Sequence, residues 1–445
     1  MRSRRGVGGR LEANDEIVLL EFGGFLRLCS GAMTEDLKAS YSRYVIPTYG
    51  RFDLCVARGS GTRVWDFEGR EYLDFGGGIA VCSIGHAHPR VTAAVVEQAS
   101  TLVHTSNLYY TGPQAAVAKR LVDFIGLGGK VFCCNSGAEA NEGLIKLARR
   151  FGHATGGRYE VLTFKNSFHG RTMAGISATG QDKVKVGFAP LLDGFQHLPP
   201  GDIDAVRAAI SDKTAAILLE PIQGEGGIHL AKPEYLRALR ELCDEADLLL
   251  LYDEVQCGLG RTGDWCGWRS IVAEGAEPDA VSWAKGIANG YPLGAFWAGA
   301  RDVGGTPLCD LLGPGSHGTT YGGNPVMCAA ATAVFDEIEE KHLLAHAKDA
   351  GAHIVSRLAA EPLAIREIRS IGLMIGLELD PDAIEQSILD LAPTPALALT
   401  KHLLHAGLLV VPAGERTIRL LPPLNVSFEE LDEAAAILIS ALTAR

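Results

Sequence analysis

A lysine and an aspartate each follow a short apolar run, and together they point to carbanion chemistry. Asp253 ends the run Leu248–Tyr252, and Lys285 follows the run Ala280–Ala284. If the runs are strands of one parallel sheet, both side chains reach the carboxyl edge, where open α/β sheets bind ligands. A lysine amine can hold pyridoxal phosphate as a Schiff base, and a buried carboxylate can keep its pyridine nitrogen protonated. Lys285 alone would more often be a solvated loop residue, so the prediction depends on the surrounding segments.

Two segments offer groups that could bind a phosphate. Ser136 and Gly137 follow a strand-like run and open a predicted helix, where N–H groups, the helix dipole and a hydroxyl form an anion site. Ser136 and Glu139 also match an ordinary capping box, which alone would explain the segment. The second segment, His317–Asn324, brings hydroxyls such as that of Thr320, and could equally be a structural turn.

Phe168 and Arg171 follow another strand-like run and would reach the same crevice. A ring such as Phe168 can stack on a pyridine, and a guanidinium can hold a carboxylate through two hydrogen bonds. Most single arginines after a strand are surface residues. This segment therefore gains weight only from its position between other crevice segments.

The segment Glu220–Gly227 carries two carboxylates, Glu220 and Glu225, into a glycine-rich loop. Acids at buried strand ends need a cationic or hydrogen-bonding partner, because desolvation of a charge is costly. A metal is the rival interpretation, but no His or Asp lies at ligand spacing, so we expect no metal site. Arg419 is a single charge in the apolar run Thr417–Leu421, where a solvated edge position is usual. We expect it instead to pair with an acid or a substrate carboxylate.

Composition narrows the class of protein. A chain of 445 residues that is 47% hydrophobic predicts a globular enzyme with more than one compact unit. Its formal charge of −12 repels phosphate backbones and anionic lipid, which excludes nucleic acid and membrane surfaces as partners. Ten cysteines without a CxxC pattern predict buried free thiols. Because no apolar run approaches the ~20 residues that span a bilayer, we expect a cytoplasmic location.

Four regions follow one another along the chain. Residues 1–32 are predicted to be a disordered extension or a misassigned start. Residues 33–88 are predicted to be an N-terminal arm that packs with the small domain and has a hairpin around Glu68-Gly69. Between 89 and 330, helical stretches alternate with strand-like runs, which predicts a large α/β domain with a doubly wound, mostly parallel sheet. Residues 331–445 predict a smaller α+β domain.

The strand and helix predictions are specific. In the large domain the strands are expected near residues 131–134, 161–164, 216–219, 248–252 and 280–284, with a helix at 113–125. In the small domain, strands are expected near 374–379 and 417–421, and a closing helix is capped by Ser427 and Glu430.

Taken in this order, the segments resemble the class III pyridoxal-phosphate aminotransferases of fold type I, most closely the acetylornithine aminotransferase branch. The likeness runs from about Tyr41 to Ala444, and its motifs are Leu251–Gln256, Gly258–Gly263, Ala284–Gly286, Gly77–Val81 and Phe168–Thr172. The resemblance implies a homodimer with shared active sites. It also implies transfer of the δ-amino group of N2-acetylornithine to 2-oxoglutarate, in arginine synthesis.

The resemblance further implies roles toward the cofactor ring. Lys285 would form the Schiff base and then shuttle a proton. Asp253 would hold the pyridinium nitrogen, and Gln256 would hold the ring hydroxyl. Val255 and Phe168 would enclose the ring between them.

The remaining implied roles concern the phosphate and the substrates. The phosphate would be held by Ser136 and Gly137. Thr320 of the partner subunit would join them. Arg171 would bind the α-carboxylate of the acylated diamine, and Arg419 that of glutamate or 2-oxoglutarate. Glu225 would act as a switch, pairing with Arg419 when the diamine is bound and swinging away when glutamate arrives.

Other functions remain open at this point. Related enzymes use ornithine, succinylornithine, succinyl-diaminopimelate or 4-aminobutyrate, and differ in pocket residues that one sequence does not locate. A fold-type I decarboxylase or mutase is a different class, against which Arg419 with Glu225 favours transamination. A noncatalytic binding protein is hard to reconcile with Lys285 and Asp253 together.

Overall fold

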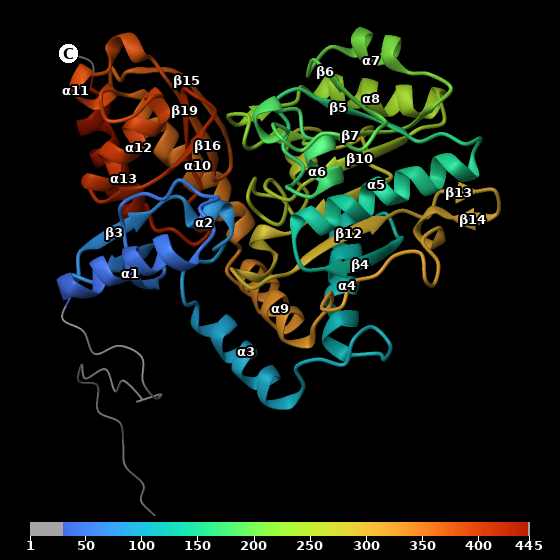
Figure 1. Ribbon diagram of the computed structural model, residues 1–445, viewed down its shortest axis with the longest axis horizontal. Helices are drawn as coiled ribbons and strands as arrows, with labels where there is room; N and C mark the ends of the chain where they lie inside the picture. Colours follow the sequence, from blue (N-terminus) through green and yellow to red (C-terminus); the bar gives the residue numbers. More distant parts are fainter. Residues whose placement is uncertain (1–29, 444–445) are drawn as a thin grey trace, which may run out of the picture. The chain divides into compact units, whose positions relative to one another are not determined.

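The computed structural model describes residues 30–443. The chain divides between Cys55 and Val56 into two compact units. Helix α1 (Ser30–Tyr44) belongs to the first unit, and every strand in the described part of the chain belongs to the second (Figure 1). The predicted extension of residues 1–32 lies outside the described residues, except that its last three begin α1.

The largest sheet of the second unit has seven strands. In spatial order its strands are β4 (Lys130–Cys134), β12 (Gly294–Ala298), β11 (Ala280–Trp283), β10 (Leu249–Asp253), β7 (Thr214–Leu219), β5 (Glu160–Phe164) and β6 (Phe195–Leu198). Strand β12 runs antiparallel to both neighbours, and the remaining pairs are parallel. The predicted doubly wound, mostly parallel α/β sheet is confirmed with all five predicted strands, to which the structure adds β6 and β12.

Helices cover both faces of this sheet because successive strand residues point to opposite sides. In β10, Leu249 and Leu251 pack in the same core cluster as the buried side chains of α5 (Gly137–Ala154). Leu250 and Tyr252 pack instead with the buried side chains of α8 (Pro233–Glu245). Figure 1 shows α5 running across the sheet. With both faces covered, the edge formed by the strand ends is left for a ligand.

A second, four-stranded antiparallel sheet follows later in the chain. Its strands, in order, are β15 (Ile365–Ile371), β16 (Met374–Leu379), β19 (Thr417–Leu420) and β18 (Val411–Ala413). The helices that pack around it are α10 (Leu343–Ala359), α12 (Pro395–His405) and α13 (Phe428–Leu442). Helix α9 (Pro325–Glu340) precedes them and packs mainly against α3 (Pro89–Thr101) and α4 (Gly112–Ile125). The predicted capping box of Ser427 and Glu430 is present at the start of α13. The predicted domain boundaries after residues 88 and 330 stay predictions.

The predicted hairpin around Gly69 is also present. Its strands join a third sheet in the order β1 (Val56–Ser60), β2 (Arg63–Asp66), β3 (Glu71–Asp74) and β17 (Leu408–Leu409). The remaining elements are α2 (Gly77–Ala80), α3 (Pro89–Thr101), α4 (Gly112–Ile125), α6 (Met173–Ala178), α7 (Ile203–Ala209), α11 (Gln386–Leu389), the pair β8 (Ile222–Gln223) and β9 (His229–Leu230), and the pair β13 (Asp302–Val303) and β14 (Thr306–Pro307). The bounds of α4 match the predicted helix to within one residue.

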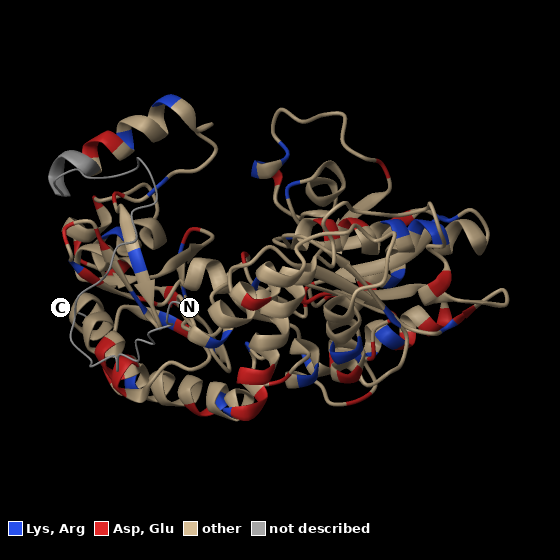
Figure 2. Cartoon of the chain, turned by 90° about the horizontal axis from the view of Figure 1, so that it is seen from below, with Lys and Arg blue, Asp and Glu red and all other residues tan. Residues whose placement is uncertain are grey.

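Charge, helix length and cysteine burial can each be compared with what the composition predicted. Figure 2 shows basic residues (blue) and acidic residues (red) interspersed along several helices. Within residues 30–443, no helix combines the length and the apolar character needed to cross a bilayer. Nine of the cysteines are described and carry free thiols; the expectation of burial is wrong for three half-buried ones, Cys55, Cys82 and Cys309.

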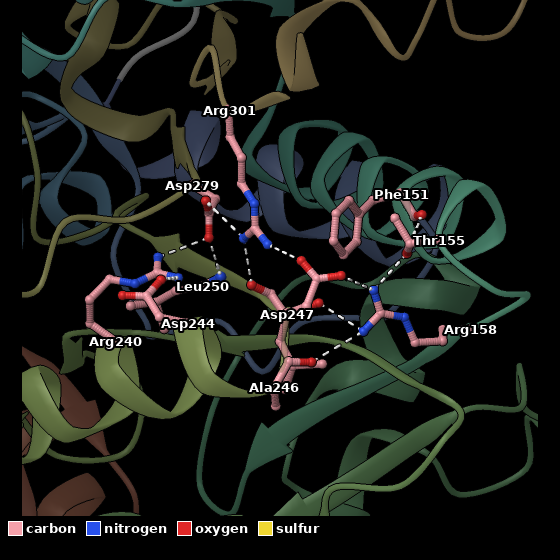
Figure 3. Close-up of polar contacts among 11 residues, drawn as sticks. Phe151, Thr155, Arg158, Arg240, Asp244, Ala246, Asp247, Leu250, Asp279 and Arg301 are labelled. Carbon is pink, nitrogen blue, oxygen red and sulfur yellow. Dashed lines mark hydrogen bonds and ion pairs between the residues drawn. The ribbon is translucent and has the colours of Figure 1, made fainter. Parts of the chain in front are cut away.

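A network of ion pairs joins the amino ends of the sheet strands, opposite the ligand edge (Figure 3). Asp279, just before β11, accepts hydrogen bonds from Arg240 at 2.9 Å and from the backbone N–H of Leu250 at 2.8 Å. Arg301, just after β12, contacts Asp279 at 3.4 Å and also pairs with Asp247, which precedes β10. Asp279 and Arg301 thus link β10, β11 and β12, and Arg240 joins a neighbouring helix to the same nearly buried carboxylate.

Replacing Asp279 with alanine is therefore expected to lower the free energy of unfolding by about 3 kcal/mol, because it removes the one nearly buried carboxylate that two partly buried guanidinium groups and a backbone N–H share. Asp244 is the matched control: it pairs with Arg240 at 2.6 Å, but its side chain is 65% exposed, against 9% for Asp279. Asp244→Ala should cost at most about 1 kcal/mol. Urea unfolding of both variants measures the difference, and equal losses would contradict this role for Asp279.

Candidate active site

A crevice of about 370 Å³ lies where the parallel strands of the large sheet end. The predicted site residues that line it are Ser136, Gly137, Phe168, Arg171, Glu225, Asp253, Val255, Gln256 and Lys285. Of the two others, Arg419 is buried and hydrogen-bonds to Glu225 at the crevice wall. Thr320 is exposed and lines a separate cavity. The sequence therefore located the crevice, because each contributing segment follows a strand of one sheet.

Asp253 ends β10 and is held by three donors. Its Oδ2 accepts hydrogen bonds from Asn141 Nδ2 at 2.6 Å and from His169 Nδ1 at 2.8 Å, and its Oδ1 accepts from the backbone N–H of Val255 at 3.1 Å. Because a carboxylate only accepts, Nδ1 of His169 must carry the proton. Ser282 Oγ in turn donates to Asn141 Oδ1 at 2.6 Å. These bonds hold a buried anion, 3% exposed, in one orientation at the crevice.

Asn141 was not among the predicted site residues, and His169 was predicted only as part of the motif that marks the family branch. A signal for Asn141 was present. It lies one turn before Leu144 on the inward face of α5, and a polar residue on an apolar helix face needs a partner. The partner, Asp253, lies 112 residues further along the chain, so only the fold identifies it.

Lys285 follows β11 and adopts a left-handed backbone conformation with φ of 44°. Burial lowers the pKa of its amine by desolvating the ammonium form, while the nearby charge of Glu225 opposes the shift and that of Arg419 adds to it. A lower pKa increases the fraction of neutral amine. The neutral form is the one that attacks a carbonyl carbon or accepts a proton.

Ser136 caps the amino end of α5 and accepts a hydrogen bond from the backbone N–H of Glu139 at 3.2 Å. The predicted capping box is incomplete, because the Glu139 carboxylate instead accepts from the backbone N–H of Asn135 at 2.5 Å. A Cβ on Gly137 would come within 2.7 Å of Val255 Cγ1, so a larger residue does not fit here. This helix start therefore brings backbone N–H groups directly to the crevice wall, where an anion can bind.

Arg419 and Glu225 form an ion pair beside the crevice. Arg419 Nη1 donates to Glu225 Oε1 at 2.9 Å and to Gln256 Oε1 at 3.0 Å, and Nη2 donates to Glu225 Oε2 at 3.2 Å. Burial alone would raise the pKa of Glu225, but the charge and hydrogen bonds of Arg419 outweigh it and lower that pKa. The carboxylate is thus ionised and neutralises the guanidinium.

Glu220 connects two walls of the crevice. One carboxylate oxygen accepts from the backbone N–H of Phe168 at 2.8 Å, and the other accepts from that of Gly224 at 3.0 Å. Burial and the charge of Asp253 raise the pKa of Glu220. The hydrogen-bonding partners expected for an acid at this strand end are thus backbone N–H groups.

Arg171 lies at the open side of the crevice. Arg171 is exposed, and its guanidinium carbon lies 5.4 Å from the centroid of the Phe168 ring. An exposed guanidinium at the rim can bind a carboxylate of an incoming molecule.

Comparison with known proteins shows the family to which this chain belongs. The sequence profile of the family described as aminotransferase class-III matches residues 44–442. The chain belongs to the class III aminotransferases. It is 44% identical over 406 residues to the acetylornithine aminotransferase of Caldanaerobacter subterraneus subsp. tengcongensis, covering 90% of this chain and 98% of that protein. It is 45% identical to the acetylornithine aminotransferase of Myxococcus xanthus, covering 92% and 98%.

Solved structures agree with this family. The ornithine aminotransferase of Toxoplasma gondii matches with a TM-score of 0.82 and 33% identity, over 92% of this chain and 94% of that chain. The acetylornithine aminotransferase of Elizabethkingia anophelis matches with a TM-score of 0.76 and 28% identity, over 92% and 98%. This class III aminotransferase is an enzyme that moves an amino group from a small-molecule donor to a keto acid, with pyridoxal phosphate as its cofactor.

The crevice fits this cofactor on structural grounds. It combines a buried aspartate, a desolvated lysine and a helix start too crowded for a side chain at Gly137. These are the groups that a protonated pyridine nitrogen, an aldehyde and a phosphate require.

Proposed function

We propose that this enzyme transfers the δ-amino group of N2-acetylornithine to 2-oxoglutarate in a ping-pong reaction, in the cytoplasm and in the service of arginine synthesis. The observation that carries the substrate assignment is the Arg419–Glu225 pair at the crevice. The names of the relatives from Caldanaerobacter and Myxococcus support it.

The cofactor assignments are those that the family resemblance implies, and the burial of Asp253 and Lys285 at the crevice supports them. When bound, pyridoxal phosphate supplies a ring that withdraws electrons from the substrate carbon. Asp253 would hold the protonated ring nitrogen, and Gln256 the ring hydroxyl. Val255 and Phe168 would enclose the ring. Lys285 would carry the cofactor covalently and then move a proton at the substrate carbon.

The remaining assignments concern the phosphate and the substrates. Ser136 and Gly137 would hold the phosphate at the start of α5. Arg171 at the rim would bind the α-carboxylate of the acylated diamine. Arg419 would bind the α-carboxylate of the dicarboxylate, once Glu225 has turned away.

Thr320 would complete the phosphate site of a second copy, so we propose a homodimer with shared active sites. Its segment lies next to exposed apolar side chains: Asn107 Nδ2 donates to the carbonyl oxygen of Gly322 at 2.8 Å. The exposed apolar residues in these two segments include Leu108, Tyr109, Tyr110 and Tyr321. Such a surface is typical of a subunit interface. Analytical ultracentrifugation of the holoenzyme distinguishes this assembly from a monomer.

Glu225→Ala is expected to change the choice between substrates. The acylated diamine brings no carboxylate to Arg419, so removal of Glu225 leaves a buried cation uncompensated and should cost about 3 kcal/mol, or roughly 10²-fold in kcat/KM for the diamine. The glutamate half-reaction should be retained, because glutamate supplies its own carboxylate. Stopped-flow measurement of each half-reaction gives the ratio. Equal losses in both would count against the switch.

A panel of amino donors tests the proposed substrate. We expect the purified holoenzyme to react with N2-acetylornithine faster than with ornithine, succinylornithine, succinyl-diaminopimelate or 4-aminobutyrate. The similarity to the Toxoplasma enzyme makes ornithine the second candidate. A faster reaction with free ornithine would overturn the acetylornithine assignment. Release of CO2 without consumption of 2-oxoglutarate would overturn transamination itself.

A further inference from the structure

The antiparallel sheet places two arginines on either side of a glycine. Arg369 in β15 pairs with Gly376 in β16, and Gly376 pairs with Arg419 in β19. Directly paired residues of antiparallel strands direct their side chains to the same face. Arg369 and Arg419 therefore project from one face, separated by a position that carries no side chain. We name this position the Gly376 notch.

The loop that carries Glu225 fills the Gly376 notch. A Cβ on Gly376 would come within 2.9 Å of Ile228 Cβ and within 3.0 Å of the Gly227 carbonyl oxygen. Ile228 is fully buried and has a φ of 58°, a left-handed conformation that β-branched residues rarely adopt. Such backbone strain persists only where the surroundings impose it. The notch thus holds the end of the loop in one place.

Both arginines bind this loop, at different points. Arg419 binds the Glu225 carboxylate, and Arg369 Nε donates to the Gly227 carbonyl oxygen at 3.0 Å. Arg369 is itself fixed, because its Nη2 donates to Thr417 Oγ1 at 3.1 Å. Its Nη1 group binds Glu367 at 2.5 Å and also pairs with Glu378. Its side chain is only 8% exposed, so this guanidinium is a rigid support and not a surface charge.

We propose that Arg369 is a specificity-determining positioning residue, which holds the Gly224–Ile228 loop in the Gly376 notch so that Glu225 reaches Arg419. The inference rests on the proposed Glu225 switch. With its end anchored, the loop stays in place while only the Glu225 side chain turns away for glutamate and returns for the acylated diamine. Without the anchor, Glu225 spends less time against Arg419, and the uncompensated cation disfavours the diamine.

The test compares the two half-reactions of the holoenzyme, followed by the change in its visible spectrum, for Arg369→Met. We expect kcat/KM for N2-acetylornithine to fall about tenfold, the scale of one lost hydrogen bond from a charged donor, with the glutamate half-reaction within about twofold. Arg366→Met is the matched control on the same strand. Its side chain is 41% exposed and forms ion pairs only with Asp380 and Asp382 among the described residues, so both half-reactions should be unchanged.

A double variant separates a role through Glu225 from a general structural role. In the Glu225→Ala background, Arg369→Met should cause no further change in either half-reaction, because its target has been removed. Gly376→Ala, which displaces the loop while leaving Arg369 intact, should give the same selective loss and replaces Arg369→Met if that variant fails to fold.

Equal losses in both half-reactions, or an additive loss in the double variant, would overturn the role of Arg369. An unchanged Arg369→Met beside a selective Glu225→Ala would overturn it and leave the switch standing. No selectivity in Glu225→Ala would remove the switch and this inference together.

Discussion

Replacing Lys285 with alanine is expected to lower the rate of both half-reactions by about 10⁴-fold, the upper range for loss of a positioned acid–base group. The structure gives the reason. Lys285 follows β11, has a left-handed backbone conformation and lines the crevice. Desolvation lowers the pKa of its amine, which increases the fraction of the neutral form. Methyl groups cannot attack a carbonyl or move a proton. The expected residual rate is that of bound cofactor without a catalytic amine.

Spectra separate loss of chemistry from loss of cofactor. Lys285→Ala should lose the visible absorbance of the lysine-linked cofactor and its trapping by borohydride, while noncovalent cofactor still binds through the helix start and Asp253. Lys130→Ala is the control, because that lysine is 64% exposed and pairs with Asp310 at 2.5 Å. It should keep full activity. A Lys285→Ala enzyme that retained its activity within tenfold would remove Lys285 from the reaction.

Most of the large sheet could be predicted because each predicted strand is marked by its own short stretch of sequence. Runs such as Leu248–Tyr252 are apolar throughout, which is typical of strands covered on both faces by helices. Strands β12 and β18 were missed for a physical reason. Gly294–Ala298 has no alternation or β-branched residue to mark it, and Val411–Ala413 contains a proline within three residues. Their strand conformation depends on the neighbours that they pair with.

The site residues also fall into those that the sequence could predict and those that it could not. Residues that follow a strand, such as Asp253 and Lys285, could be predicted because the strand ends share an edge. Contacts across the fold could not. Two of the three donors that fix Asp253 come from a helix and a loop far away in the chain, and the position of Arg369 beside Gly227 depends on the register of the antiparallel sheet. A one-residue shift in that register would turn Arg369 to the other face.

Asp253→Asn is expected to lower both half-reactions by about 10²- to 10⁴-fold, with N2-acetylornithine and glutamate affected equally. A neutral amide cannot stabilise a protonated ring nitrogen, and the loss of one member of a buried charge pair costs about 3–5 kcal/mol. The substitution also conflicts with the network. Oδ2 of Asp253 accepts from both Asn141 and His169, and an amide NH2 in that place would face two donors.

The equal effect on both donors distinguishes Asp253 from Glu225, whose removal should affect only the acylated diamine. Asp279→Asn is the control, since Asp279 precedes β11 at the opposite edge of the same sheet and should alter stability without changing either half-reaction beyond about twofold. Single-turnover rates for both substrates provide the measurement. A loss below tenfold, or one confined to a single substrate, would mean that Asp253 does not hold the ring nitrogen. The electron-withdrawing power of the cofactor would then have to come from another group in the crevice, and the buried, triply hydrogen-bonded carboxylate would lack a chemical reason for its position.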